Sequence, residues 1–155
     1  MDIQTWELLS YIVTTIGLPL AIFVFLYEQK KERDNEEEEV YQLLSDAYQD
    51  FLKITLDHSD LSLFSTEQTP ELTKEQRERM TIIFSMLISL FERAYLLLYE
   101  ARMSAQQTRR WLSWEDYMLE WCRRADFRAR LPELLEGEDA EFVTYIRALA
   151  TASAR

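Results

Sequence analysis

The sequence predicts an all-α protein in which an N-terminal transmembrane helix precedes a bundle of about four helices. Three observations support this prediction. Residues Trp6–Tyr27 form an apolar run of 22 residues, the length that a helix needs to cross about 30 Å of hydrocarbon. Gly occurs twice and Pro three times in 155 residues, so few residues interrupt helices. Apolar residues also recur at helical spacing through the rest of the chain.

The N-terminal run is expected to be a retained anchor rather than a cleaved signal peptide. Signal peptides begin with basic residues and end in small ones, whereas this chain begins MDIQTWE and its apolar run ends FVFLY. The basic cluster KKER follows at 30–33, which predicts an outer N-terminus and a cytoplasmic remainder. We expect Trp6–Tyr27 to contact the lipid bilayer, residues 1–31 to form the anchor and its flank, and residues 32–155 to form a cytoplasmic helical domain.

Charge and cysteine content narrow the range of partners. The net charge is −11; residues 1–100 contain 8 basic and 19 acidic side chains, and residues 101–155 contain 9 of each. Because nucleic acid repels an acidic protein, no nucleic-acid partner is expected. The lone cysteine, Cys122, excludes an internal disulfide and fits a reducing cytoplasm.

The segment after the anchor predicts a long helix ending near His58. It contains no Gly or Pro, and its apolar residues are spaced like a heptad seam. The transmembrane helix either continues into this helix or breaks near Asp34–Asn35. Glu36–Glu39 is expected to be a solvated helical turn, and a lone His beside carboxylates predicts no metal site. The seam consists of Val40, Leu44, Ala47, Phe51 and Ile54.

A loop at 59–72 is expected to precede a second long helix. Thr73 and Gln76 have the spacing of a capping box. The helix then includes Met80–Tyr99, twenty residues that are apolar on nearly every side. Since charges in the middle of a span are costly, Glu92 and Arg93 favour a central bundle helix over a second membrane span. They are candidate buried charges: Glu92 is expected to pair with a C-terminal arginine or, alternatively, to act as a sensor, and Arg93 to extend to solvent.

The C-terminal third predicts three shorter helical segments. Ser113 is expected to be the N-cap of the first, and Pro132 the first residue of a helical turn over 131–136. The last helix is expected over 138–152. One face of the first helix consists of Trp114, Tyr117, Met118 and Trp121.

An arginine- and tryptophan-rich region is the candidate partner-binding site. Residues 101–130 contain 7 Arg and 4 acids, the only basic region of the predicted cytoplasmic part. Trp and Arg dominate protein–protein hot spots and arginine also binds phosphates. Alternatively, the tryptophans fill the core and the arginines pair with the acidic first helix. The candidate residues are Arg109, Arg110, Trp111, Trp114, Arg123 and Arg124.

The phrases LPLAIFVFLYEQKKERDNEEEEVYQLLSDAYQDFLK, LFERAYLLLYE and WEDYMLEWCRR resemble an uncharacterised group of small bacterial single-pass membrane proteins. The resemblance spans most of the chain. It implies an anchor followed by a cytoplasmic helical domain in the bacterial inner membrane. It transfers no catalytic or binding residue.

The sequence therefore predicts a membrane-anchored interaction module, an adaptor or accessory subunit, with a protein partner or a homo-oligomer. The alternative is a self-associating membrane effector or small channel gated by its cytoplasmic domain. No nucleophile–base pair, Gly-rich phosphate loop or metal-ligand spacing is present, so we expect no catalytic residue, cofactor or metal.

Overall fold

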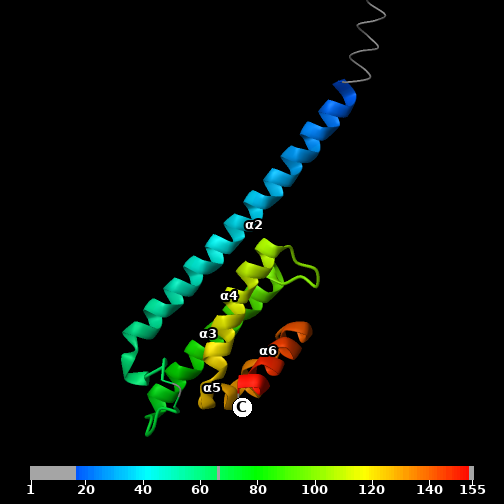
Figure 1. Ribbon diagram of the computed structural model, residues 1–155. Coiled ribbons are helices and arrows are strands. Elements are labelled where there is room, and N and C mark those ends of the chain that lie inside the picture. Colours follow the sequence, from blue (N-terminus) through cyan, green and yellow to red (C-terminus); the bar gives the residue numbers. More distant parts are fainter. Residues whose placement is uncertain (1–16, 66, 154–155) are drawn as a thin grey trace, which may run out of the picture. The chain divides into compact units, whose positions relative to one another are not determined.

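Helices account for nearly all the regular structure in the residues that the computed structural model describes, 17–65 and 67–153 (Figure 1). The prediction of an all-α chain is confirmed for this part. The helices are α2 (Leu18–Asp57), the short 3₁₀ helix η2 (Ser59–Leu61), α3 (Lys74–Leu98), α4 (Ala105–Cys122), α5 (Ala125–Leu134) and α6 (Ala140–Ser153).

The chain divides into two compact units, Met1–Val40 and Tyr41–Arg155. Helix α2 belongs to both and is helical through Asp34–Asn35, where the sequence allowed a break. In the first unit, a described apolar stretch, Leu18–Tyr27, precedes a run of charged residues. In the second unit, helices α3 to α6 and the end of α2 pack around one core.

Helices α3 and α4 both begin with a capping box. The Thr73 hydroxyl accepts a hydrogen bond from the Gln76 amide, and the Gln76 side chain accepts one from the Thr73 amide, so the predicted capping box is confirmed. Ser104 and Gln107 form an identical box at the start of α4. The prediction that Ser113 caps this helix is wrong, because the Ser104 box satisfies the first free amides two turns earlier.

The prediction for Pro132 is also wrong. Pro132 lies inside α5, near its C-terminal end, rather than at the first position of a separate turn over 131–136. Helix α5 begins instead at Ala125. Gly137, with φ +89°, lies beyond the end of α5 in the left-handed region that glycine adopts without strain. Helix α6 then follows close to its predicted range.

Helix α3 is the central helix of the second unit. The apolar side chains on one broad face of α3 are buried, and the helix packs against α4, α5 and α6. Helix α2 contributes Leu44, Tyr48, Phe51 and Thr55 to the core, so its buried seam is displaced from the predicted one: Ala47 and Ile54 are half-buried. Aromatic residues join α2 to α4, with the Tyr48 and Tyr117 rings stacked at 4.3 Å between centroids.

Half of the predicted span Trp6–Tyr27, residues 6–16, lies outside the described residues, which begin at Gly17. Among the described helices, only the internal helix α3 has the length and apolar character to cross a membrane. Its residues Met80, Phe84, Leu87, Ile88 and Phe91 have no exposed surface. Such burial is typical of the core helix of a bundle.

Candidate functional site

The two tryptophans predicted to bind a partner lie in the core of the second unit. Trp111 and Trp114 are 2% and 1% exposed. Trp114 makes an edge-to-face contact with the ring of Tyr48. Trp111 makes edge-to-face contacts with the rings of Tyr95 and Tyr145. These indoles therefore stabilise the fold and are not available to a partner at the surface.

A short chain of hydrogen bonds runs from Trp111 to α6. The Trp111 indole N–H donates to the Tyr145 hydroxyl at 3.1 Å, and that hydroxyl donates to a Glu115 carboxylate oxygen. Burial and the Glu115 hydrogen bond raise the pKa of Tyr145 above its ordinary value. The phenol therefore stays protonated and can donate to Glu115 while it accepts from the indole.

The four candidate arginines have different environments. Arg109 and Arg123 are exposed on α4 and just beyond it. The Arg110 guanidinium lies over the Tyr41 ring, 5.6 Å from its centroid, which is cation–π geometry. Arg124 is 2% exposed. The six residues predicted as one binding surface are thus divided between core and surface.

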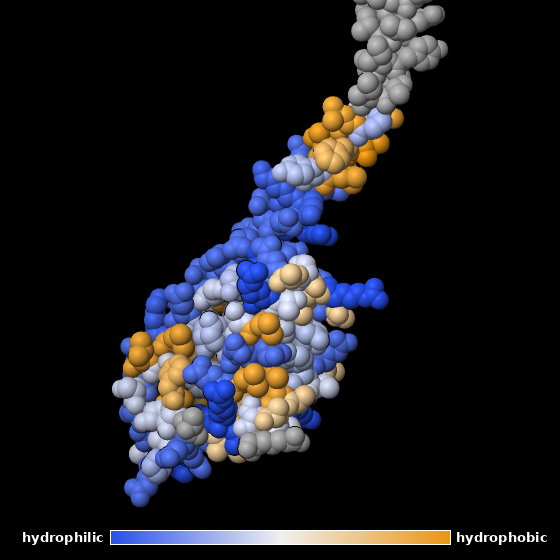
Figure 2. Space-filling model, viewed as in Figure 1, coloured by the Kyte–Doolittle hydropathy of each residue, from blue (hydrophilic) through white to orange (hydrophobic). Residues whose placement is uncertain are grey.

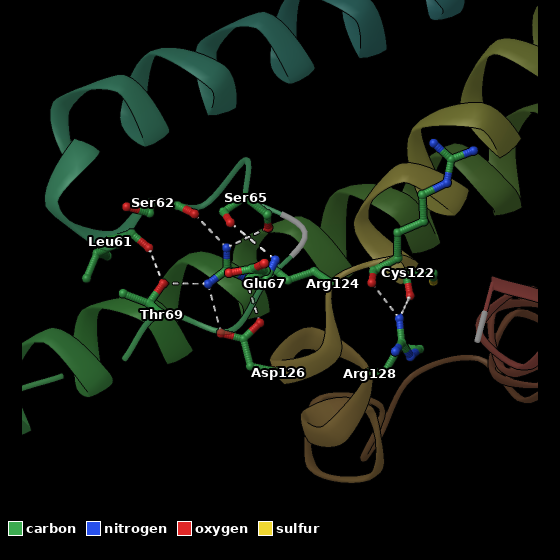
Figure 3. A network of polar contacts seen from close by, with 10 residues as sticks. Leu61, Ser62, Ser65, Glu67, Thr69, Cys122, Arg124, Asp126 and Arg128 are labelled. Atoms are coloured by element: carbon green, nitrogen blue, oxygen red, sulfur yellow. Dashed lines mark hydrogen bonds and ion pairs between the residues drawn. The ribbon is translucent and has the colours of Figure 1, made fainter. Parts of the chain in front are cut away.

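Arg124 is the centre of a buried polar network (Figure 3). Its Nε and one Nη donate to both carboxylate oxygens of Asp126, at 2.6 and 2.8 Å. The other Nη donates to the backbone oxygens of Ser62 and Ser65, at 2.6 and 3.0 Å. A fifth bond, 2.7 Å, reaches the Thr69 hydroxyl, which itself donates to the Leu61 backbone oxygen.

This network attaches the loop between α2 and α3 to the start of α5. A guanidinium has five N–H donors, and all five are used here. Arg124 therefore has no donor left for a phosphate or a partner carboxylate. Nearby, Arg128 donates to the backbone oxygens of Cys122 and Arg123 at the end of α4, both at 2.6 Å.

Glu92 and Arg93, the candidate buried charges, differ in burial. Arg93 is exposed, and it forms no ion pair with any other residue among 17–65 and 67–153. Glu92 is half-buried and accepts a hydrogen bond from the Asp139 amide at 2.5 Å. It also hydrogen-bonds Glu138. The partner of Glu92 is thus the start of α6 rather than a C-terminal arginine.

An open groove of about 560 Å³ lies between α2 and α3 in the second unit. Small and apolar side chains line most of this groove. An anionic side chain, Asp50, lies on its α2 side, and a cationic side chain, Arg93, lies on its α3 side. The residues that line it are Ala47, Asp50, Phe51 and Ile54 from α2, and Ser85, Met86, Ser89, Leu90 and Arg93 from α3.

Large apolar side chains extend this groove along the outer face of α3. Ile82, Met86, Leu96 and Leu97 are 55, 43, 58 and 55% exposed. Sequence reasoning missed this surface because it assigned the apolar run Met80–Tyr99 to the core as a whole. The sequence did contain a signal for this surface. A helix that is apolar on nearly every side needs neighbours on every side to be buried completely. The chain has few further helices that could cover it, so one apolar face is left exposed.

The remaining chemistry-bearing groups do not form a metal centre in the described segments. No three of their His, Cys, Asp or Glu side chains are placed to share a metal ion. Cys122 is fully buried, and this burial raises the pKa of its thiol to about 12. Its thiol is therefore protonated at neutral pH and unreactive as a nucleophile.

Comparisons of the chain with protein-family models, curated proteins and solved structures found no match. Its candidate sites are therefore those that its own residues define. They are the α2–α3 groove with the outer face of α3, the Arg124 network, and the Glu92–Glu138 pair at the start of α6.

Proposed function

We propose that this chain is a membrane-anchored helical interaction module, an adaptor or accessory subunit without catalytic activity, whose docking surface is the α2–α3 groove. One observation carries the proposal: Ile82, Met86, Leu96 and Leu97 are about half exposed on one helix. Large apolar side chains gathered at the surface of one helix mark candidate sites of interaction. The groove beside it offers a concave seat for a partner's side chains.

The start of α2 supports the membrane anchor. Its large apolar side chains between Leu18 and Tyr27 are exposed on every side of the helix, and a strongly polar segment follows (Figure 2). A helix that is apolar all round needs an apolar environment, which lipid supplies. In this proposal the N-terminus lies outside the bacterial inner membrane and the second unit lies in the cytoplasm, as the basic residues at 30–33 favour.

The anchor is tested by adding one charge to the apolar segment. A carboxylate near the middle of a span costs about 2.5–3.5 kcal/mol on insertion scales, so Leu18→Asp should transfer much of the protein to the carbonate-soluble fraction. Gln29→Asp, in the polar flank, is the matched control and should remain with the membranes. Equal extraction of both variants and the unaltered chain would contradict the anchor.

The docking surface is tested by photo-crosslinking in cells that express the full chain. A benzoylphenylalanine at Met86 should form a protein adduct of defined mass, because the partner covers this position. The same residue at Ala148, exposed on α6, is the control and should form none. Absence of an adduct at Met86 would remove the groove from the proposal.

A self-associating effector or small channel is the second candidate. It is favoured by the apolar character of α3, the only described helix that meets the length and composition of a span. An effector should make cells permeable to small dyes when it is overexpressed, whereas an adaptor should leave them intact. Dye uptake that requires an unaltered outer face of α3 would favour the effector.

A further inference from the structure

On the outer face of α3, two exposed apolar residues, Ile82 and Leu96, lie at equal distances on either side of Ser89. Ile82 and Leu96 each lie seven residues from Ser89, and Ser85 and Arg93 each lie four residues from it. At 100° per residue these positions share one side of the helix. The exposed stretch from Ile82 to Leu96 is about 21 Å long at 1.5 Å per residue. Two such faces in antiparallel contact would bring Ile82 of each copy to Leu96 of the other.

The groove carries one anionic and one cationic side chain, so its charges are self-complementary. Arg93 on α3 is a cation without an ion pair in the described residues, and Asp50 lies on the α2 side of the same groove. Within residues 17–65 and 67–153, the ion pair of Asp50 is with Lys53, one turn along the same helix, at 2.8 Å, and both side chains are more than 70% exposed. A twofold axis repeats each contact, so an attraction between Arg93 and the Asp50 of a second copy would occur twice.

We propose that the occupant of the α2–α3 groove is a second copy of this chain, with the two α3 helices packed antiparallel around a twofold axis near Ser89. This inference rests on the proposed function, because it identifies the partner at the docking surface named there. Ser89 is small and exposed, so the two helices can approach closely where they cross. Ile82, Met86, Leu96 and Leu97 would become buried on both copies.

The size of the surface sets the strength of the dimer. Stable complexes bury about 800 Å² per partner, and one helical face about 21 Å long supplies less than this. The dimer should therefore dissociate on dilution in detergent. Anchoring in a membrane raises the effective concentration of both copies and restricts their orientation, which favours a weak twofold contact.

The test uses the full chain with Ser89→Cys in its native membrane and a short bismaleimide cross-linker. Cys122 is buried, so the unaltered chain supplies the background. A residue near a twofold axis lies close to the same residue of the second copy. The Ser89→Cys variant should therefore yield a covalent dimer, at least about tenfold above background. Ala148→Cys, on the exposed side of α6, is the matched control and should remain at background.

A charge exchange in the Ser89→Cys chain tests the geometry without disturbing the core. Arg93→Glu and Asp50→Lys should each lower the yield of dimer about tenfold, because each replaces two attractions with two repulsions. The two substitutions together should restore the yield. Both positions are exposed, so the circular dichroism spectra and melting temperatures of these variants should match those of the unaltered chain.

Several outcomes would overturn the inference, and they separate it from the proposed function. A Met86 adduct with a different protein, without any dimer of the Ser89→Cys chain, would refute the second copy and leave the interaction module standing. Labelling of Met86 by a photoactive lipid would assign the face to the bilayer instead. Dimers of equal yield from the Ser89→Cys and Ala148→Cys chains, or single charge variants that the double exchange does not rescue, would refute the twofold contact near Ser89.

Discussion

The Glu92 carboxylate accepts a hydrogen bond from the backbone amide of Asp139 at 2.5 Å, which joins the C-terminal third of α3 to the start of α6. Asp139 in turn caps α6, since its carboxylate accepts from the amides of Glu141 and Phe142, each at 3.0 Å. Glu138 completes the cluster. Its hydrogen bond to Glu92, its burial and the charge of Glu92 raise its pKa from 4.5 to about 7.

Stability should therefore depend on the protonation of Glu138. Its pKa is higher in the folded chain than its ordinary value, so the folded state holds this proton more tightly. The contribution of protonated Glu138 to the free energy of unfolding is complete below about pH 4.5 and is lost as the pH rises through about 7. Solvent reaches this side chain, so the loss should be no more than about 1 kcal/mol. Urea denaturation at pH 6 and pH 8.5 measures it.

Glu138→Gln should remove this part of the pH dependence, because the amide donates to Glu92 at every pH. Glu136→Gln, at an exposed position just before Gly137, is the matched control and should keep the full dependence. If both variants respond to pH alike, the pair does not share a proton.

Tyr145→Phe should destabilise the second unit by about 1–2 kcal/mol, because it leaves the indole N–H of buried Trp111 without its acceptor. Tyr117→Phe is the control. Tyr117 stacks on Tyr48, and phenylalanine preserves that stacking, so the change should be below about 0.5 kcal/mol. Thermal unfolding of both variants distinguishes them, and equal losses would show that the Tyr145 hydroxyl contributes nothing specific.

The fold was largely predictable because local signals determine it. The scarcity of Gly and Pro and the Thr73 capping box lead directly to the helices that are present. Ser104 and Gln107 have the same spacing as Thr73 and Gln76, so the start of α4 was readable from the same rule. Pro132 was misplaced because proline is favoured at the first helical position, whereas here it lies two residues before the end of α5, where it removes one backbone hydrogen bond.

The environment of each charged residue was not predictable in the same way. Arg123 and Arg124 are adjacent in sequence, yet one is exposed and the other is buried. The difference depends on a loop more than fifty residues away, whose backbone oxygens form the Arg124 site. The groove was missed for a related reason: composition shows how apolar α3 is, but only the packing shows which of its faces stays uncovered.

Cys122 should be protected from thiol reagents in the folded chain. Burial raises its pKa to about 12, so at pH 8 the thiolate fraction is smaller than that of an exposed thiol by a factor on the order of a thousand. Native protein should react with a chromogenic disulfide correspondingly slowly, and protein in concentrated urea should react at once. Rapid labelling of the native chain would show that α4 opens locally near Cys122.

Arg124→Ala should destabilise the second unit by about 3–5 kcal/mol, because it leaves the Asp126 carboxylate buried without its cation and the Ser62 and Ser65 oxygens without donors. Arg124→Lys should recover only part of this, since an ammonium cannot reach both carboxylate oxygens and the loop in one geometry. Arg123→Ala, the exposed neighbour, is the matched control and should change the free energy of unfolding by less than about 0.5 kcal/mol. Urea denaturation measures all three, and limited proteolysis between residues 59 and 72 should increase in Arg124→Ala alone. Losses of similar size for Arg123 and Arg124 would contradict the role of the network in holding the loop to α5.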